Sequence, residues 1–438
     1  MPNQMNQYVS VVPSVLKTGE LEKEIVICPL QPQIRKNFEH AFKVRVWFVD
    51  SNVVHNTAWG TNVEGSPFRM TENGDLVVTL KTPREGEYAV AVDFQKPDCD
   101  PQKMVFSIYA LKEDLFALRP FKGDFHMHSF CSDGAQSPEY VAATCRKTGF
   151  DFMALTDHKR YAPSLQARDF IAEMGCDMLV TPGEEIHLPD NPVHIVNFGG
   201  TSSVNDLAYG DEEQYRAGVA EYMKAVPEDY EAPARFQVAA SEWIFDRVRE
   251  TGGICMFCHP FWRPMNHNYI GEDVIDLLME HNKFDVLEVF GGFYVQDVED
   301  NMLSLSRWQE ERAKGKMIPV AGVSDSHDCD HDLAGWYYTV LFAEKLDFDS
   351  IAESIRSNRS TAVHWIPGRD PVVAGSFRLT KFVYFLLREF YPQHDALCAL
   401  EGEMLRRYLS GEEPDAKVYL ASRKGRVAAF MNQYWEKA

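Results

Sequence analysis

The 438-residue sequence predicts an α/β protein whose central part folds as a closed or nearly closed barrel. Three observations support this fold class. Residues 1–120 have strand patterns, residues 121–368 alternate strand and helix patterns, and residues 369–438 show helical spacing of apolar side chains. Parallel strands that are joined by helices close into a barrel, and the functional groups then lie at the C-terminal ends of the strands.

Residues 1–120 are expected to form a small antiparallel β-sandwich. β-branched and aromatic residues dominate four segments, and residues 72–75 and 84–87 supply turns. Because this region contains no metal-ligand cluster, we expect it to serve docking or oligomer contact, with binding of a ligand such as a sugar as the alternative. The four segments are residues 43–48, 76–80, 88–94 and 104–109.

Residues 121–368 carry the alternation that indicates the barrel. Ser137 and Pro138 are typical of an N-cap and a first helical residue, and Gly149 ends the helix that they begin. Residues 201–245, rich in acidic and aromatic side chains, interrupt the alternation and are expected to form a helical cap over the site. The predicted strands are residues 152–156, 178–181, 194–198, 254–257, 286–289 and 318–321.

Residues 369–438 are predicted to form a helical extension. Apolar side chains such as Phe382, Val383, Leu386 and Leu387 recur at helical spacing. We expect this apolar stripe to pack against the main domain.

Charge and composition limit the partners. The formal net charge of −21 argues against a long nucleic acid, because phosphate backbones require a basic surface. A small phosphorylated substrate is compatible, since bound metal ions supply local positive charge. Nine cysteines without paired spacing favour reduced thiols, and the first seven residues lack the features of a secretion signal. We therefore expect a cytoplasmic protein without a membrane partner, whose oligomeric state stays open.

Imidazole and carboxylate side chains cluster where the predicted strands end. His126 and His128 are two residues apart, so in an extended segment both side chains point to one face. A single histidine is usually structural, but the whole set lies at strand exits, as a hydrolytic metal centre requires. The candidate segments are residues 124–133, 156–158, 183–187, 194, 258–260 and 324–327.

The order of these motifs resembles the PHP (polymerase and histidinol phosphatase) superfamily, in particular its stand-alone phosphoesterases. The resemblance is carried by His126-Met-His-Ser-Phe-Cys-Ser-Asp-Gly134, followed by Leu155-Thr-Asp-His158. It covers residues 121–364, where residues 351–359 are similar to the last helix of the family, and it excludes both terminal regions. It implies a distorted (β/α)7 barrel that holds two or three divalent metal ions.

The resemblance also implies a complete set of metal ligands, with Glu185 shared between two of the ions. This completeness favours an active enzyme over a noncatalytic metal-binding protein. The implied sets are His126, His128, Glu185 and Asp325 for one ion, Glu185, His194 and His259 for a second, and Asp133, His158 and His327 for a third.

Some assignments stay open at this level. Glu184 and His187 flank Glu185, so the ligand assignment could be wrong by one position. Asp124 and Asp157 either orient ligating imidazoles or cap turns. Imidazole and carboxylate ligands without thiolate suit Mn, Fe or Zn, and the sequence does not distinguish among these metals.

The leading hypothesis is a metal-dependent phosphoesterase that cleaves a small phosphate mono- or diester, such as a nucleotide or phosphorylated metabolite, with a metal-bound hydroxide. Asp325 or His327 is expected to deliver a proton to the leaving oxygen. Lys159, Arg160 and Arg263 follow ligand positions and are expected to bind the phosphate. The alternatives are a C–N or C–O hydrolase of amidohydrolase type and a noncatalytic metal-binding or sensing protein.

Overall fold

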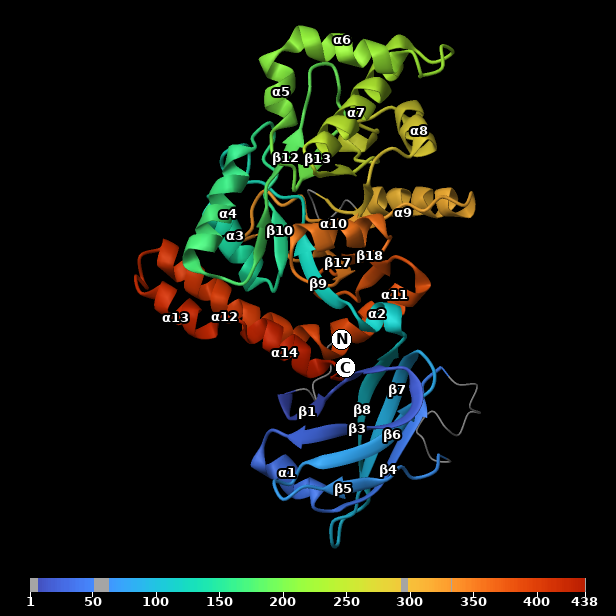
Figure 1. Ribbon diagram of the computed structural model, residues 1–438, viewed down its shortest axis with the longest axis vertical. Helices are drawn as coiled ribbons and strands as arrows, with labels where there is room; N and C mark the ends of the chain where they lie inside the picture. Colours follow the sequence, from blue (N-terminus) through green and yellow to red (C-terminus); the bar gives the residue numbers. More distant parts are fainter. Residues whose placement is uncertain (1–6, 51–62, 293–297, 332, 438) are drawn as a thin grey trace. The chain divides into compact units, whose positions relative to one another are not determined.

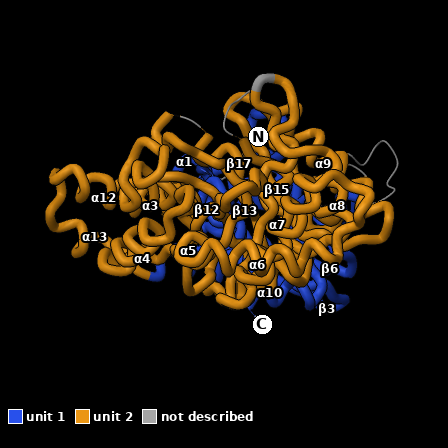
Figure 2. The backbone as a smooth tube through the Cα atoms, turned by 90° about the horizontal axis from the view of Figure 1, so that it is seen from above, with its two compact units in different colours: residues 1–119, 381–394, 425–438 blue, residues 120–380, 395–424 orange. Residues whose placement is uncertain are grey.

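The computed structural model describes residues 7–50, 63–292, 298–331 and 333–437. Two compact units divide the chain (Figure 2): one comprises residues 1–119, 381–394 and 425–438, and the other comprises residues 120–380 and 395–424. The residues expected to form one C-terminal extension are therefore shared between the two units. Residues 1–6, which carry most of the evidence against a secretion signal, lie outside the described residues.

The first unit contains two four-stranded sheets. Their strands pair antiparallel, except that β2 runs parallel to β8. One sheet has the order β1 (Val9–Val12), β3 (Gly19–Pro29), β6 (Leu76–Thr82), β5 (Phe68–Met70), and the other has the order β2 (Val15–Lys17), β8 (Gln102–Leu111), β7 (Gly86–Phe94), β4 (Ala41–Phe48).

Alternating apolar side chains from both sheets fill the core of this unit. Val90 and Val92 of β7 belong to the same buried cluster as Ile25 and Ile27 of β3, as expected for strands with one buried face. The other face of β8 is also covered, because the Tyr109 ring lies 4.8 Å from the ring of a C-terminal residue, Phe382. Helices α1 (Pro32–Phe38), α2 (Glu113–Phe116) and α14 (Arg426–Tyr434) belong to this unit, together with most of α11 (Phe377–Glu389) and the first residues of α12 (Tyr391–Leu409).

The second unit is mixed α/β, with two further sheets. Helices α3 (Pro138–Lys147), α4 (Ala162–Met174), α8 (Glu272–His281), α9 (Val298–Ala313) and α10 (Phe348–Arg356) connect strands, and α12 (Tyr391–Leu409) and α13 (Ala416–Arg423) follow. The six-stranded sheet has the order β11 (Leu179–Thr181), β10 (Phe152–Ala154), β9 (Arg119–Asp124), β17 (Tyr337–Ala343), β18 (Ser360–His364), β19 (Val372–Ala374). The five-stranded sheet has the order β12 (Gly183–Ile186), β13 (Ile195–Phe198), β14 (Ile254–Phe257), β15 (Val286–Phe290), β16 (Val320–Gly322).

The strands of the second unit are not all parallel, which corrects the sequence-based expectation. Strand β13 is antiparallel to both of its neighbours, β12 and β14, and β18 is antiparallel to β17 and β19. Because Ile186 pairs with Ile195, the start of β13 lies beside the end of β12. His194, just before β13, therefore reaches the same sheet edge as side chains that follow the parallel strands.

The helices of this unit begin where the sequence indicates. The Ser137 hydroxyl accepts a hydrogen bond from the Tyr140 backbone N–H at 3.2 Å, which caps α3. Residues 201–245 are helical as expected, forming α5 (Val204–Gly210), α6 (Glu212–Met223) and most of α7 (Ala232–Glu250). Helix α6 lies across the ends of α5 and α7 (Figure 1). Among the described residues, we find no helix that is both long and apolar enough to cross a bilayer.

Candidate metal centre

Glu185 of β12 lies at the middle of the imidazole cluster. Its carboxylate is fully buried, and its oxygens lie 2.7 Å from His158 Nδ1 and 2.8 Å from His194 Nδ1. His126 Nε2, His128 Nε2 and His259 Nε2 follow at 3.3, 3.4 and 3.6 Å. Five predicted ligands from four segments of the chain therefore surround one carboxylate.

Asp325 provides a second carboxylate on the same side. Its Oδ1 lies 2.9 Å from His128 Nε2 and 3.2 Å from His126 Nε2. With Glu185, these residues form a group whose ligand atoms all lie within 4.8 Å of one another. This group has the same members as the first predicted ligand set.

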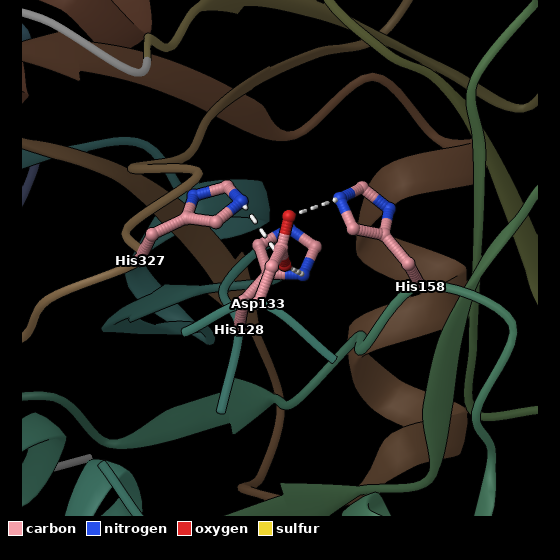
Figure 3. Close-up of side chains that lie close together, drawn as sticks. All are labelled: His128, Asp133, His158 and His327. Atoms are coloured by element: carbon pink, nitrogen blue, oxygen red, sulfur yellow. Dashed lines mark ion pairs between the residues drawn. The ribbon is translucent and has the colours of Figure 1, made fainter. Parts of the chain in front are cut away.

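Asp133 gathers another group at the edge of the centre. Figure 3 shows its carboxylate between the rings of His327 and His158, each at 3.4 Å through Nε2, with His128 close by. His128 Nδ1 lies 3.9 Å from Asp133. Because the Asp133 side chain is 54% exposed, this edge of the centre is open to solvent.

The second predicted ligand set also comes together. His194 Nδ1 and His259 Nε2 lie 3.3 Å apart, and both face Oε1 of Glu185. Each of the nine positions carried over by the resemblance thus lies in one connected cluster. Their roles as metal ligands remain a prediction, which the proposal below takes up.

The electrostatics of Glu185 fit a bound cation. Burial disfavours a charged carboxylate, but the imidazoles of His158, His194 and His126 hold the pKa of Glu185 well below its usual range. Both oxygens of Glu185 lie against imidazole nitrogens. A buried carboxylate surrounded by imidazole nitrogens offers the ligand atoms that divalent metal ions bind.

Local backbone conformation also marks the centre. His259 and Asp325 have φ angles of 25° and 50°, and Lys159, which follows His158, has a φ of 58°. Positive φ is uncommon for residues other than glycine, and such conformations concentrate at functional sites. These three residues lie in or next to the cluster, so the fold holds an unfavourable backbone conformation there.

Glu184 and Glu185 differ in their surroundings. Glu184 points away from the centre and accepts hydrogen bonds from Ser203 Oγ at 2.6 Å, Val204 N at 2.6 Å and Asn205 Nδ2 at 2.9 Å. It therefore holds the start of α5. His187 does reach the centre, since its Nε2 lies 2.9 Å from His158 Nδ1.

Asp124 and Asp157 accept hydrogen bonds from backbone turns. Of the two roles that the sequence left open, orienting imidazoles and capping turns, these contacts correspond to the second. Asp124 accepts hydrogen bonds from the N–H groups of His126 and Ser324, so it ties together two segments that carry ligands. Asp157 accepts hydrogen bonds from the N–H and the hydroxyl of Ser129 and from the hydroxyl of Ser132. Both carboxylates thus fix the loops from which ligands project.

Glu288 is a member of the site that the sequence analysis did not single out. Its Oε2 lies 3.1 Å from His126 Nδ1, and its side chain is 1% exposed. The signal was present, because Glu288 is the charged residue within the otherwise apolar strand β15. A charged side chain in a buried strand requires a partner.

Two connected clefts open at the cluster. Asp133 and His158 line both of them. The smaller cleft, about 240 Å³, is lined also by His194, His259, Trp262, Asp325 and His327. The larger, about 650 Å³, is lined also by Cys131, Ser132, Lys159, Arg160, His187 and Tyr209.

The three predicted phosphate-binding cations differ in their surroundings. Lys159 and Arg160 are exposed in the larger cleft, and no carboxylate of the described residues forms an ion pair with either. Arg263 instead pairs with Glu299 and donates a hydrogen bond to the Asn266 carbonyl at 3.1 Å. It lines neither cleft, because these contacts direct its guanidinium elsewhere.

Comparisons with known proteins were made for the whole chain, and no family model matches it. A curated relative, DNA polymerase/3'-5' exonuclease PolX of Bacillus subtilis (strain 168), is 34% identical over 90 residues, which are 20% of this chain and 16% of PolX. The chain therefore matches only a small part of that relative's length.

Two solved structures are similar at low identity. A two-domain protein from Bacteroides vulgatus ATCC 8482, described as containing a predicted PHP-like metal-dependent phosphoesterase, is 19% identical, with 57% of this chain and 66% of that chain covered and a TM-score of 0.40. The lesion-specific endonuclease PfuEndoQ from Pyrococcus furiosus is 14% identical, with 72% and 90% covered and a TM-score of 0.34. The first description carries the family name that the sequence motifs suggest.

Proposed function

We propose that the protein is a metal-dependent phosphoesterase that hydrolyses a small phosphate mono- or diester, such as a nucleotide or a phosphorylated metabolite. One observation carries this proposal: buried imidazoles and carboxylates gather around Glu185, beside a cleft with two cations that pair with no carboxylate of the described residues. The cluster can bind cations, and the cleft can bind an anion next to them.

The proposal assigns two or three divalent ions, Mn, Fe or Zn, to the cluster. Ions held there supply Lewis-acid activation of water and of the phosphoryl group. The proposed ligand sets are His126, His128, Glu185 and Asp325, then Glu185, His194 and His259, and then Asp133, His158 and His327.

We include a distorted seven-stranded barrel in the proposal. Isolated bridges pair His158 with Glu185, after β10 and in β12, and pair Met127 with Ser326, after β9 and β16. These pairings support a closed ring of strands in the order β9, β10, β12, β13, β14, β15, β16. The ligand-bearing segments then meet at one end of the ring.

Side chains of the protein bind the phosphate of the substrate and supply a proton to its leaving oxygen. Lys159 and Arg160 hold phosphoryl oxygens from the larger cleft, where Arg160 offers paired donors and Lys159 a point charge. His327 lies at the open edge beside Asp133, so it is the candidate that delivers a proton to the leaving oxygen. Asp325 is the second candidate, although its contacts with His126 and His128 place it deeper in the centre.

A small substrate fits better than a long nucleic acid. The net charge of −21 disfavours binding of the phosphate backbone of a long nucleic acid, even though PolX is named as a DNA polymerase and exonuclease and PfuEndoQ as a lesion-specific endonuclease. The volume of the larger cleft, about 650 Å³, is that of a small-molecule site.

The same clefts favour this proposal over its alternatives. A C–N or C–O hydrolase would not need Lys159 and Arg160 facing the metal cluster. A noncatalytic metal-binding protein would enclose its ions, whereas here Asp133, His158 and His327 line an open cleft. Both contrasts rest on residues that the structure describes.

Turnover with added metal tests the proposal. The purified protein is supplied with Mn, Zn or Fe and assayed on phosphomonoesters, phosphodiesters and a DNA oligonucleotide, with free phosphate and leaving group measured together. We expect metal-dependent release from small esters that a chelator abolishes. Cleavage of the oligonucleotide alone would replace the small-substrate assignment, and no release from a metal-loaded protein would contradict the phosphoesterase.

A further inference from the structure

The buried carboxylate of Glu288 contacts the far side of a predicted ligand. His126 turns its Nε2 toward Glu185 and Asp325, at 3.3 and 3.2 Å. The other ring nitrogen, Nδ1, lies 3.1 Å from Glu288 Oε2. Both side chains are buried, at 0% and 1% exposure, so water does not compete for either nitrogen.

We propose that Glu288 is a positioning residue that fixes the tautomer and the orientation of His126. The Glu288 carboxylate accepts a hydrogen bond from Nδ1–H of His126, which leaves the lone pair of Nε2 directed at Glu185 and Asp325. A neutral imidazole carries one proton, and only the nitrogen without it can bind a metal ion. The inference rests on the proposed function only in requiring that the centre binds metal.

The fold keeps a place for this carboxylate. A Cβ atom added at Gly291 would lie 2.1 Å from Glu288 Oε1, so a side chain at position 291 would displace the Glu288 carboxylate. Asn301 of α9 holds Gly291 on both sides, since it accepts from Gly291 N and donates to Gly291 O, each at 2.8 Å. Helix α9 thereby keeps Gly291 against Glu288.

Other imidazoles of the centre are held differently. His327 Nδ1 lies 2.8 Å from the backbone carbonyl oxygen of Asp325. His259 Nδ1 has no hydrogen bond to any described residue. A carboxylate partner on His126 also raises the basicity of its Nε2, which a backbone carbonyl does to a smaller extent.

Metal affinity and histidine tautomers test the inference in the full-length protein. The variants are Glu288→Gln, Glu288→Ala and Gly291→Ala, and Glu311→Gln is the matched control. Glu311 is equally buried but pairs with Lys314 and Lys316 away from the centre. Zn affinity is measured by competition with a chromophoric chelator, and ¹⁵N NMR of the Zn-loaded protein, labelled at histidine, reports which ring nitrogen of His126 carries the proton.

We expect Glu288→Ala to weaken Zn binding about 10- to 100-fold. Glu288→Gln should lose less Zn affinity than Glu288→Ala, because its amide oxygen still accepts a hydrogen bond. Gly291→Ala should also weaken Zn binding, although it retains the Glu288 carboxylate. The His126 resonances should lose the Nδ1–H pattern in Glu288→Ala, while those of His327 stay unchanged. Glu311→Gln should alter neither property.

Unchanged Zn affinity and an unchanged His126 tautomer in folded Glu288→Ala would overturn the inference. An equal loss of affinity in Glu311→Gln would do so as well, because it would indicate a general packing effect. Neither readout needs turnover. A protein whose Zn affinity depends on Glu288 but which releases no phosphate would therefore contradict the proposed function and leave this inference intact.

Discussion

At the residue scale, burial and the neighbouring carboxylates shift the pKa values of the imidazoles in the centre in opposite directions. Burial lowers the pKa of His194 to about 3 and that of His128 to about 4, although carboxylates lie beside both rings. For His158 burial also lowers the pKa, but Glu185 outweighs it and raises the pKa to about 9. Neutral rings offer lone pairs to a cation, and a bound cation would displace the proton that His158 otherwise holds.

The double substitution His126→Ala, His128→Ala is the first prediction at this scale. It removes two nitrogen ligands from the group around Glu185 and Asp325. We expect loss of bound metal and a fall of turnover by more than about 100-fold. This exceeds the effect of removing one residue that only hydrogen-bonds to a metal ligand. Metal content by mass spectrometry and the ester assay measure both. The control is His331→Ala, an 81% exposed side chain outside the cluster. Full turnover in the double variant would refute the site.

The cations of the larger cleft give a second prediction. We expect Lys159→Met, Arg160→Met to lower kcat/KM for a phosphate ester about 10-fold or more, because charge-assisted hydrogen bonds contribute more than ~1.4 kcal/mol each. Metal content should not change. Lys224→Met, which removes a cation paired with Glu221 on α6, is the control. Equal effects of the two variants on kcat/KM would argue against a phosphate site.

At the element scale, strand direction decides which side chains meet. His194 precedes its strand, whereas most other ligands follow theirs. Antiparallel pairing of β13 with β12 and β14 nevertheless brings it to the same edge. Helix ends contribute by fixing loops, as Glu184 does where it accepts hydrogen bonds at the start of α5.

Removal of one helix cap should affect stability without affecting chemistry. Ser137→Ala deletes the acceptor for Tyr140 N at the start of α3. We expect a loss of about 1 kcal/mol in the free energy of unfolding, measured by urea titration. Ser137→Asp retains a capping oxygen and should remain close to the native value. A null effect of the alanine variant would show that the cap contributes little.

His364, at the end of β18, should make stability depend on pH. Burial, and then Arg369, lowers the pKa of His364 below its ordinary 6.5 in the folded protein. The unfolded chain therefore binds a proton first as the pH falls through 6.5, and stability decreases toward acid. Comparing unfolding free energies at pH 7.5 and 5.5 in metal-free protein, we expect a smaller decrease for His364→Asn. An identical decrease would exclude this contribution.

At the scale of the whole molecule, the candidate centre belongs to one compact unit. All of the predicted ligands lie between residues 126 and 327, within the unit formed by residues 120–380 and 395–424. The described residues of the other unit form a β core of their own. Loss of metal should therefore destabilise that unit and leave the other unchanged.

Metal removal tests this localisation. Ions that bind only the folded state stabilise it by about 2.7 kcal/mol when the free ion concentration is about 100 times the dissociation constant. After chelation, we expect faster hydrogen exchange in the segments that carry ligands, such as residues 124–133 and 324–327. Segments of β7 and β8 should exchange as before. Uniform acceleration throughout the chain would contradict a local metal site.

The sequence by itself determined the candidate ligand residues and much of the local structure. Spacing and residue type identified His126, His128 and Asp325, the N-cap at Ser137, and strands such as β7 and β14, because these features depend on neighbours along the chain. It also supplied the resemblance that grouped the ligands.

Only the tertiary structure decided which distant groups meet. It turned Glu185 toward the imidazole cluster and Glu184 away from it, and it directed Arg263 to Glu299. It also reversed β13 and brought Glu288 to His126 across 162 positions. It also divided residues 369–438 between two units. These outcomes depend on burial and on strand pairing between segments far apart in the chain, and local periodicity contains no information about either.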